Sequence, residues 1–314
     1  MKKRLSSFIA HALLVAIILL TASPAFAQAR PNPTLAAAPA GFDARRDGVT
    51  RGRVERIEFD SSVTGNKRPA MVYTPPGYSA ERKYPVLYLL HGIGGNENHW
   101  TQFGAADAIL DNLIADGKAT PMIVVMPNGR ASNEPSTAFG RGGGGGARGG
   151  AAAPGAGGGA AGGGRGAGMG GEFEAYAAFE RELLKDLIPF IQARYSVNSD
   201  RTQRALAGLS MGGGQSLNFG LANLDTFAWV GGFSSAPNTQ QPAQLVPNPA
   251  AAKEKLKLLW VSCGNEDSLF NISEGVHNYL TERGVPHAWH IDAGAHTFPV
   301  WKNDLYHLSA LLFR

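Results

Sequence analysis

The pentapeptide Gly208-Leu209-Ser210-Met211-Gly212 limits the fold more than any other feature of this 314-residue sequence. It follows a short strand predicted at 205–207 and precedes a helix predicted from about 213 to 222. In this context a G-x-S-x-G pattern is typical of a tight turn at the carboxyl edge of a sheet, where side chains larger than glycine beside the serine would clash. The pattern therefore predicts that Ser210 is an accessible nucleophile. The helix N-terminus behind it would offer N–H groups to a developing oxyanion.

From residue 53 onward, segments with strand character alternate with segments of helical spacing. This alternation predicts one α/β domain over 53–314, with a mostly parallel central sheet and helices on both faces. Together with the serine turn it predicts an α/β-hydrolase fold. The expected strands are 54–59, 70–73, 86–90, 122–126, 205–207, 227–233, 256–261 and 287–291; the expected helices are 173–195, 213–222, 272–283 and 301–313.

The first 27 residues have the pattern of a secretory signal peptide. Basic residues at 2–4 precede an apolar run at 10–20 and the small-x-small sequence Ala25-Phe26-Ala27. We expect cleavage after Ala27 and a periplasmic or secreted protein without membrane contact. The alternative is an uncleaved anchor, although the apolar run is short for a span of about 20 residues. Residues 28–52, rich in Ala, Pro and Arg, are expected to form a flexible leader.

Residues 140–171 consist almost entirely of Gly, Ala and Arg. Such a segment cannot bury enough apolar area to offset its ordering entropy, so we expect a disordered insert in a surface loop. An Arg-Gly segment that binds nucleic acid is the alternative, but this segment has no interleaved aromatic residues for base stacking. Removal of the basic signal peptide also lowers the formal net charge from +4 to +1. We therefore expect no nucleic-acid partner.

Ser210 requires a general base, and in this fold the chain order is nucleophile, acid, histidine. His296 is the one downstream histidine in a loop after the last expected strand; the others fall in expected helices or strands. The acid is expected after the strand at 256–261, where we prefer Asp267 to its neighbour Glu266. Asp292 is a weaker candidate because it is too close to His296 in sequence to come from a separate strand. Asp267 would hold the imidazole tautomer, with a helix-capping role as the alternative.

The oxyanion hole is expected to use the backbone N–H groups of Ile93 and Met211, each contributing about 3 kcal/mol. His91 precedes the nucleophile and the acid in the chain, so we expect it to anchor its loop instead of acting as the base. The sequence contains no zinc-type pair of histidines and no phosphate-binding loop. We therefore expect no metal and no cofactor. The lone Cys263 lies in an apolar strand and is expected to be a buried hydrophobe.

Aromatic residues follow both the oxyanion loop and the histidine loop. Trp100 follows the first, and Phe298 and Trp301 follow the second. We expect these three residues to line the mouth of a substrate cleft, where an aromatic acyl group could stack. For Trp301 the alternative is that it packs the last helix onto the sheet.

Six segments carry a family resemblance: 73–78 (YTPPGY), 84–95 (YPVLYLLHGIGG), 208–213 (GLSMGG), 218–238, 263–267 (CGNED) and 294–297 (GAHT). They resemble the bacterial feruloyl esterases of carbohydrate esterase family 1, which also contains acetyl-xylan esterases. The resemblance covers about residues 53–314. It implies the triad Ser210, Asp267 and His296 and an ester of plant cell-wall polysaccharide, such as feruloylated arabinoxylan, as substrate. The Gly-rich insert departs from the family pattern.

Other functions remain open at this level. An acetyl-xylan esterase would use the same residues. An acyltransferase is a further alternative, because mycobacterial mycolyltransferases share the fold and the Leu-Ser-Met turn. A non-catalytic binding protein on a hydrolase scaffold is a remote alternative, since the three expected catalytic residues are all present. The sequence leaves the oligomeric state open.

Overall fold

The structure of the chain is a computed structural model that describes residue 35, residues 37–136 and residues 165–314. The expected signal peptide and residues 140–164 of the expected Gly-rich insert lie outside the described residues. All described residues belong to one unit of the chain, Pro31–Arg314. None of the helices described in this unit is long and apolar enough to span a membrane.

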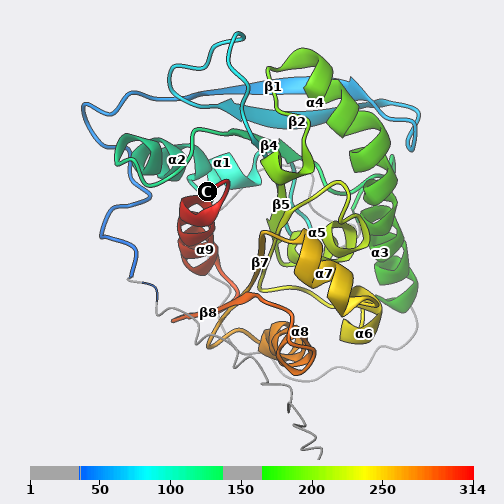
Figure 1. Ribbon diagram of the computed structural model, residues 1–314. Coiled ribbons are helices and arrows are strands. Elements are labelled where there is room, and N and C mark those ends of the chain that lie inside the picture. Colours follow the sequence, from blue (N-terminus) through cyan, green and yellow to red (C-terminus); the bar gives the residue numbers. More distant parts are fainter. Residues whose placement is uncertain (1–34, 36, 137–164) are drawn as a thin grey trace, which may run out of the picture. The chain divides into compact units, whose positions relative to one another are not determined.

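An eight-stranded sheet forms the centre of this unit, with the strand order β1-β2-β4-β3-β5-β6-β7-β8 (Figure 1). β2 runs antiparallel to both of its neighbours, whereas β4, β3, β5, β6, β7 and β8 are parallel to one another. The predicted mostly parallel sheet is therefore confirmed. The strands are β1 (Arg53–Asp60), β2 (Lys67–Thr74), β3 (Val86–Leu90), β4 (Ile123–Pro127), β5 (Arg204–Leu209), β6 (Trp229–Phe233), β7 (Leu258–Gly264) and β8 (Ala288–Asp292).

Helices cover both faces of the sheet (Figure 1). Along β3, Leu87 and Leu89 belong to the core beneath α2 and α9, while Tyr88 and Leu90 belong to the core beneath α3, α5 and α8. This division follows the two-residue period of a strand. The helices are α1 (His99–Gln102), α2 (Ala106–Ala115), α3 (Arg165–Glu182), α4 (Ile188–Arg194), α5 (Met211–Ala222), α6 (Pro242–Leu245), α7 (Pro249–Lys255), α8 (Phe270–Glu282) and α9 (Phe298–Leu311), with a π-helical turn η1 (Leu183–Leu187) and a 3₁₀ turn η2 (Arg201–Gln203).

The predicted site residues lie in loops at one edge of the sheet, where the parallel strands end. Ser210 follows β5 directly, and the loop that begins at His91 follows β3. Asp267 comes shortly after β7, and His296 shortly after β8. Because parallel strands end at the same edge, these loops converge there.

Every predicted strand is present, with ends shifted by no more than three residues. The helices differ more. The predicted helix at 173–195 is longer, because α3 begins at Arg165 and continues through η1 into α4. Residues 165–171, which we expected to belong to the disordered insert, are therefore helical, and that expectation is corrected for them. The sequence analysis did not predict α2.

The expected flexible leader is also corrected in its second half. The Asn112 side-chain amide of α2 donates to the carbonyls of Phe42 and Ala44 at 2.9 and 2.8 Å. Arg46 donates back to Asn112 Oδ1 at 3.0 Å, and the Gly52 N–H donates to Asp111 Oδ1 at 2.8 Å. Two buried polar side chains of α2 therefore bind the backbone of this segment. Composition alone could not reveal these partners.

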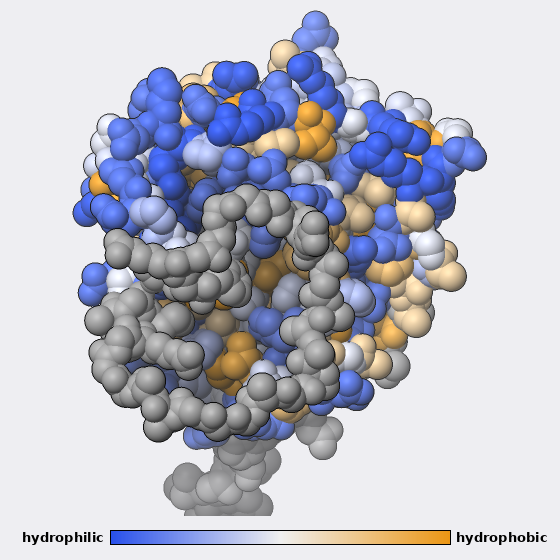
Figure 2. All heavy atoms as spheres, turned by 180° about the vertical axis from the view of Figure 1, so that it is seen from behind, coloured by the Kyte–Doolittle hydropathy of each residue, from blue (hydrophilic) through white to orange (hydrophobic). Residues whose placement is uncertain are grey.

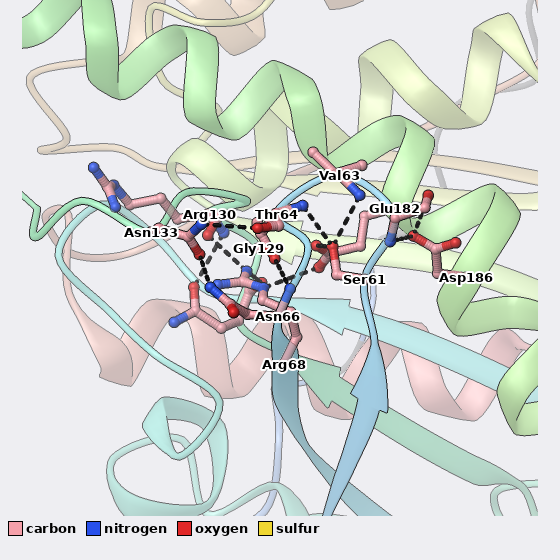
Figure 3. Close-up of polar contacts among 12 residues, drawn as sticks. Ser61, Val63, Thr64, Asn66, Arg68, Gly129, Arg130, Asn133, Glu182 and Asp186 are labelled. Atoms are coloured by element: carbon pink, nitrogen blue, oxygen red, sulfur yellow. Dashed lines mark hydrogen bonds and ion pairs between the residues drawn. The ribbon is translucent and has the colours of Figure 1, made fainter.

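A second polar network joins the β1–β2 turn to the helices on the other face (Figure 3). The buried carboxylate of Glu182 in α3 accepts from Ser61 and from Arg68, whose Nε lies 3.2 Å away. The Arg68 guanidinium also donates to the carbonyls of Asn128 and Arg130, at 2.8 and 2.6 Å. Arg68 thus holds the loop after β4, which in turn touches the candidate site.

The outer surface is mainly polar. Figure 2 shows hydrophilic residues over much of the described surface on the face opposite to the view of Figure 1, with smaller apolar areas between them. Among the described residues, Phe103 and Ile291 are the large hydrophobic side chains with substantial exposure.

Candidate active site

Ser210 occupies a strained turn between β5 and α5. Its backbone has φ 53° and ψ −118°, a combination that costs a non-glycine residue about 1–3 kcal/mol. The turn leaves no room beside it: a Cβ at Gly208 would lie 2.6 Å from the Gly212 carbonyl oxygen, and one at Gly212 would lie 2.5 Å from the His91 carbonyl oxygen. The two glycines of the predicted pattern are therefore sterically required, and they lift Ser210 from the sheet edge.

His296 links Ser210 to Asp267. Its Nε2 lies 2.9 Å from Ser210 Oγ, and its Nδ1 lies 2.7 Å from Asp267 Oδ2. Nδ1–H donates its hydrogen bond to the carboxylate, which leaves Nε2 free to accept the hydroxyl proton of Ser210. The ring of Trp301 packs edge-on against the imidazole, with centroids 4.9 Å apart. The structure thus brings together the three residues that the sequence analysis selected, in the order that nucleophile activation requires.

Asp267 is a buried carboxylate with two donors. Oδ1 accepts the Leu269 N–H at 2.8 Å, and Oδ2 faces His296. Burial would raise the pKa of Asp267, but these hydrogen bonds and the His296 ring lower it below its ordinary value. The neighbouring Glu266 is exposed, and Asp292 faces His290 instead. The geometry therefore favours Asp267 over both rivals.

The loop after β3 lies against the serine. A Cβ at Gly92 would lie 3.0 Å from Ser210 Cβ, so the glycine permits this close approach. The N–H groups of Ile93 and Met211, the predicted oxyanion donors, have no hydrogen-bond acceptor among the described residues. Both N–H groups are therefore available as donors.

His91 holds this loop to the loop after β4. Its Nε2 accepts the Gly129 N–H at 3.0 Å, which places the proton on Nδ1, next to the Gly92 carbonyl at 2.7 Å. Burial lowers the pKa of His91 to about 4. The ring is therefore neutral near pH 7, and the geometry fits the anchoring role expected from the sequence.

Two further anchors were missed by the sequence analysis. The Tyr176 hydroxyl of α3 donates to the Gly92 carbonyl at 3.1 Å. The buried amide of Gln215 in α5 donates to the carbonyls of Tyr176 and Gly129 at 2.7 and 2.8 Å. No local pattern marks such residues, because they act on backbone groups that are distant in sequence.

The predicted substrate-lining aromatic residues have different positions. Trp100 is 1% exposed and donates its indole N–H to the Leu90 carbonyl at 3.0 Å, so its predicted place at the mouth of the site is wrong. Trp301 is nearly buried beside His296. Phe298 is partly exposed and packs on Phe103, with ring centroids 5.7 Å apart. Phe103, which the sequence analysis did not select, is 37% exposed and extends this aromatic surface.

Cys263 is excluded as an alternative nucleophile. Its side chain is fully buried in β7, and burial raises the pKa of the thiol to about 12. A protonated, inaccessible thiol does not attack substrates.

Comparison with known proteins identifies the family of the chain and agrees with its fold. Residues 61–312 match the family model described as "Putative esterase", so the chain belongs to the Esterase family. An endo-1,4-beta-xylanase/feruloyl esterase of Xylanibacter ruminicola is 32% identical over 279 residues, which cover 87% of this chain and 33% of that protein. Esterase Rv1288 of Mycobacterium tuberculosis is 28% identical over 214 residues, covering 65% and 38%. The chain thus spans about a third of the length of these curated relatives.

Solved structures give the same fold class. The CE1 ferulic acid esterase of Anaeromyces mucronatus superimposes with a TM-score of 0.68 at 25% identity, over 88% of this chain and 96% of that chain. The predicted α/β-hydrolase fold and the predicted resemblance to feruloyl esterases are both confirmed by these matches.

Proposed function

We propose that this protein is a serine carboxylic-ester hydrolase with Ser210 as nucleophile, His296 as general base and Asp267 as the acid that orients it. The observation that carries the proposal is the continuous hydrogen-bonded chain from Ser210 through His296 to Asp267. In the first half-reaction His296 takes the Ser210 proton while Oγ attacks the ester carbonyl carbon. The N–H groups of Ile93 and Met211 stabilise the oxyanion, and His296 then protonates the departing alcohol. Water, activated by the same histidine, releases the acid from the acyl-enzyme.

We infer further that the acyl group is a hydroxycinnamate, as in a feruloyl esterase that acts on plant cell-wall polysaccharide. Support comes from the names of the relatives and from the aromatic surface formed by Phe103 and Phe298. Trp301 connects this surface to His296. A planar aromatic acyl group could pack there, gaining about 0.5–1.5 kcal/mol per ring pair beyond area burial.

The test is a comparison of kcat/KM for methyl ferulate, methyl p-coumarate and acetylated xylan. A hydroxycinnamate esterase should prefer the first two by more than tenfold, about the value of one to two aromatic contacts. A preference for acetylated xylan would assign the chain to acetyl-xylan deacetylation. Product analysis with an added sugar alcohol separates hydrolysis from acyl transfer, because a transferase would yield the new ester.

Two matched variants test whether Phe298 contributes to the expected preference for hydroxycinnamate esters. Phe298→Ala should raise KM for methyl ferulate several-fold, on the order of one lost ring pair, and leave kcat for p-nitrophenyl acetate nearly unchanged. Trp100→Phe is the control, because Trp100 is buried behind the surface. Equal effects of both changes on the two substrates would argue against an aromatic acyl site at Phe298.

We also propose that residues 1–27 direct export and are removed, and that the enzyme acts in the periplasm or outside the cell. N-terminal sequencing of the protein from cell fractions tests this. A mature chain that begins at Gln28 supports it, and an intact N-terminus in the cytoplasm would contradict it.

A further inference from the structure

A second histidine–carboxylate group lies beneath α9, separate from the proposed triad. His290 and Asp292 occupy alternate positions of β8 and therefore point to the same side of the sheet. Asp304 reaches them from α9. One ligand atom from each of the three side chains lies within 4.8 Å of the other two. The group is bounded by the rings of Trp260 and His307, whose centroids lie 5.2 and 5.0 Å from that of His290.

The hydrogen bonds of this group are incomplete. His290 Nε2 lies 3.1 Å from Asp292 Oδ1 without the geometry of a hydrogen bond. Asp292 Oδ2 and Asp304 Oδ2 are buried and have no hydrogen-bond partner among the described residues. Asp304 is fully buried, and Trp260 Nε1, at 3.3 Å, donates only to its other oxygen. Each carboxylate therefore keeps one buried oxygen without a donor, which is unfavourable, and a cation placed among these oxygens would satisfy both.

The pKa values of two of these side chains are shifted by their contacts. Burial and the nearby charge of Asp292 raise the pKa of Asp304 to about 7. Burial would lower the pKa of His290, but Asp292 and Asp304 together raise it above its ordinary value.

We propose that His290, Asp292 and Asp304 bind a divalent transition-metal cation, with Zn²⁺ as the preferred ion. One imidazole and two carboxylates are ligands that Zn²⁺ accepts, and solvent can supply a further position. The side chains of His290 and Asp292 are 16% and 13% exposed, and β8 is the edge strand of the sheet, so the group lies near the surface. Ligand atoms in a tetrahedral zinc site are about 3.4 Å apart, so the most distant pair would draw together by up to about 1.4 Å.

Two neighbours complete the argument for this site. Ser262 pairs with His290 across β7 and β8, and its buried hydroxyl faces Asp304, whose pKa it lowers. Gly264 pairs with Asp292, and the Gly294 carbonyl packs where a Cβ of Gly264 would lie. A bound ion would tie the end of β8 to α9. These two elements flank the loop that carries His296, so the ion would brace that loop without contacting substrate.

We expected no metal from the sequence, because it has no pair of histidines at zinc-type spacing. The ligand set proposed here is assembled by strand alternation and by a helix that returns across the sheet. It therefore has no compact sequence motif. The proposal does not depend on the proposed esterase activity.

Equilibrium dialysis of the untagged full chain tests the proposal. The protein is treated with EDTA, freed of chelator and dialysed against Zn²⁺ at pH 7.5, and bound metal is measured by elemental analysis. We expect one Zn²⁺ per chain and a higher melting temperature. Affinity should increase from pH 6 to pH 8, because the metal displaces protons from its ligands. Binding of Ca²⁺ in preference to Zn²⁺ would overturn the assignment.

Matched variants localise the ion. Asp304→Asn and His290→Gln should each weaken Zn²⁺ binding more than about 100-fold. Loss of a ligand lowers metal affinity at least as much as loss of a residue that only hydrogen-bonds to a ligand. His287→Gln is the control, because His287 forms a separate pair with His277 at 2.8 Å. Unchanged binding in Asp304→Asn, or loss of binding in His287→Gln, would overturn the proposal. Absence of stoichiometric zinc in the wild type would also overturn the proposal, and would mean that the group binds only protons.

Discussion

The two histidine–carboxylate groups at β7, β8 and α9 use the same residue types but differ in how completely they are hydrogen-bonded. Around His296, both ring nitrogens and both oxygens of Asp267 have partners. Around His290, atoms of all three polar side chains lack them. The first group can hold one geometry without assistance, as an acid–base site requires. The second group keeps buried oxygens without a donor, which a bound cation would satisfy. Satisfied hydrogen bonds, and not residue identity, therefore distinguish the proposed acid–base site from the proposed cation site.

The largest expected difference between the groups is in catalysis. Ser210→Ala should lower kcat for methyl ferulate by about 10⁵–10⁶, because the nucleophile is lost. The variant should retain the wild-type circular dichroism spectrum and bind zinc like the wild type. An activity within tenfold of the wild type would disprove the assignment of Ser210. Loss of zinc binding would show that the two groups are not separate.

The two aspartates provide the next test. Asp267→Asn should lower kcat by about 10³–10⁴, because the amide no longer selects the histidine tautomer with a free Nε2. Asp292→Asn, its counterpart in the second group, should lower kcat by less than about tenfold. Steady-state rates of both variants at pH 7 check this. Glu266→Gln should behave like the wild type. If it lowers kcat more than Asp267→Asn does, Glu266 is the acid and the choice of Asp267 is wrong.

Stability against pH should report the second group. With EDTA present, folded Asp304 holds a proton between pH 4 and about 7 that the unfolded chain releases. The free energy of unfolding should therefore fall as pH rises through this interval, by up to about 4 kcal/mol from this group. Asp304→Asn should remove this part of the slope and be more stable than the wild type at pH 8. Urea unfolding at pH 5 and pH 8 measures both effects.

Asp267→Asn is the control for that slope. The pKa of Asp267 is lowered in the folded protein. The stability that this group contributes is therefore present at pH values above its ordinary pKa, and it is lost only as pH falls through the lower, folded pKa. Its substitution should therefore leave the slope between pH 5 and pH 8 as in the wild type. A parallel slope for wild type and Asp304→Asn would contradict the proton-binding interpretation.

The smallest effect is expected at Trp301, which lies one helical turn before Asp304 on α9 and packs against His296. Trp301→Phe keeps an aromatic edge beside the imidazole and removes an indole N–H that has no partner among the described residues. We expect kcat to fall by no more than about fivefold, with KM and zinc affinity unchanged. A loss above 100-fold would mean that the indole, and not the Asp267 contact, positions His296.

The sequence predicted the strands and the proposed triad because these depend on local patterns. Continuous apolar runs identify strands buried on both faces, and the glycines around Ser210 identify its turn. Chain order then left few candidates for His296 and Asp267. These inferences need no knowledge of which distant residues touch.

The predictions that failed concern distant partners. Trp100 follows the oxyanion loop closely, but its indole N–H has an acceptor inside the core, at Leu90. The segment from Phe42 to Gly52 has the composition of a flexible leader, yet Asn112 binds its carbonyls. Tyr176 and the second histidine group were missed for the same reason, since their function depends on contacts between separate elements.

The backbone at Ser210 also sets a conflict between selection for activity and selection for stability. Its dihedral angles suit glycine better than any residue with a Cβ, so the position proposed for the nucleophile is occupied by a residue that weakens the fold. Replacement by glycine would relieve the strain while abolishing the nucleophile, whereas most substitutions in a protein are destabilising. In a lineage that no longer needed ester hydrolysis, drift would therefore favour loss of this serine before loss of His296 or Asp267, and a glycine at 210 would be the mark of an inactive descendant.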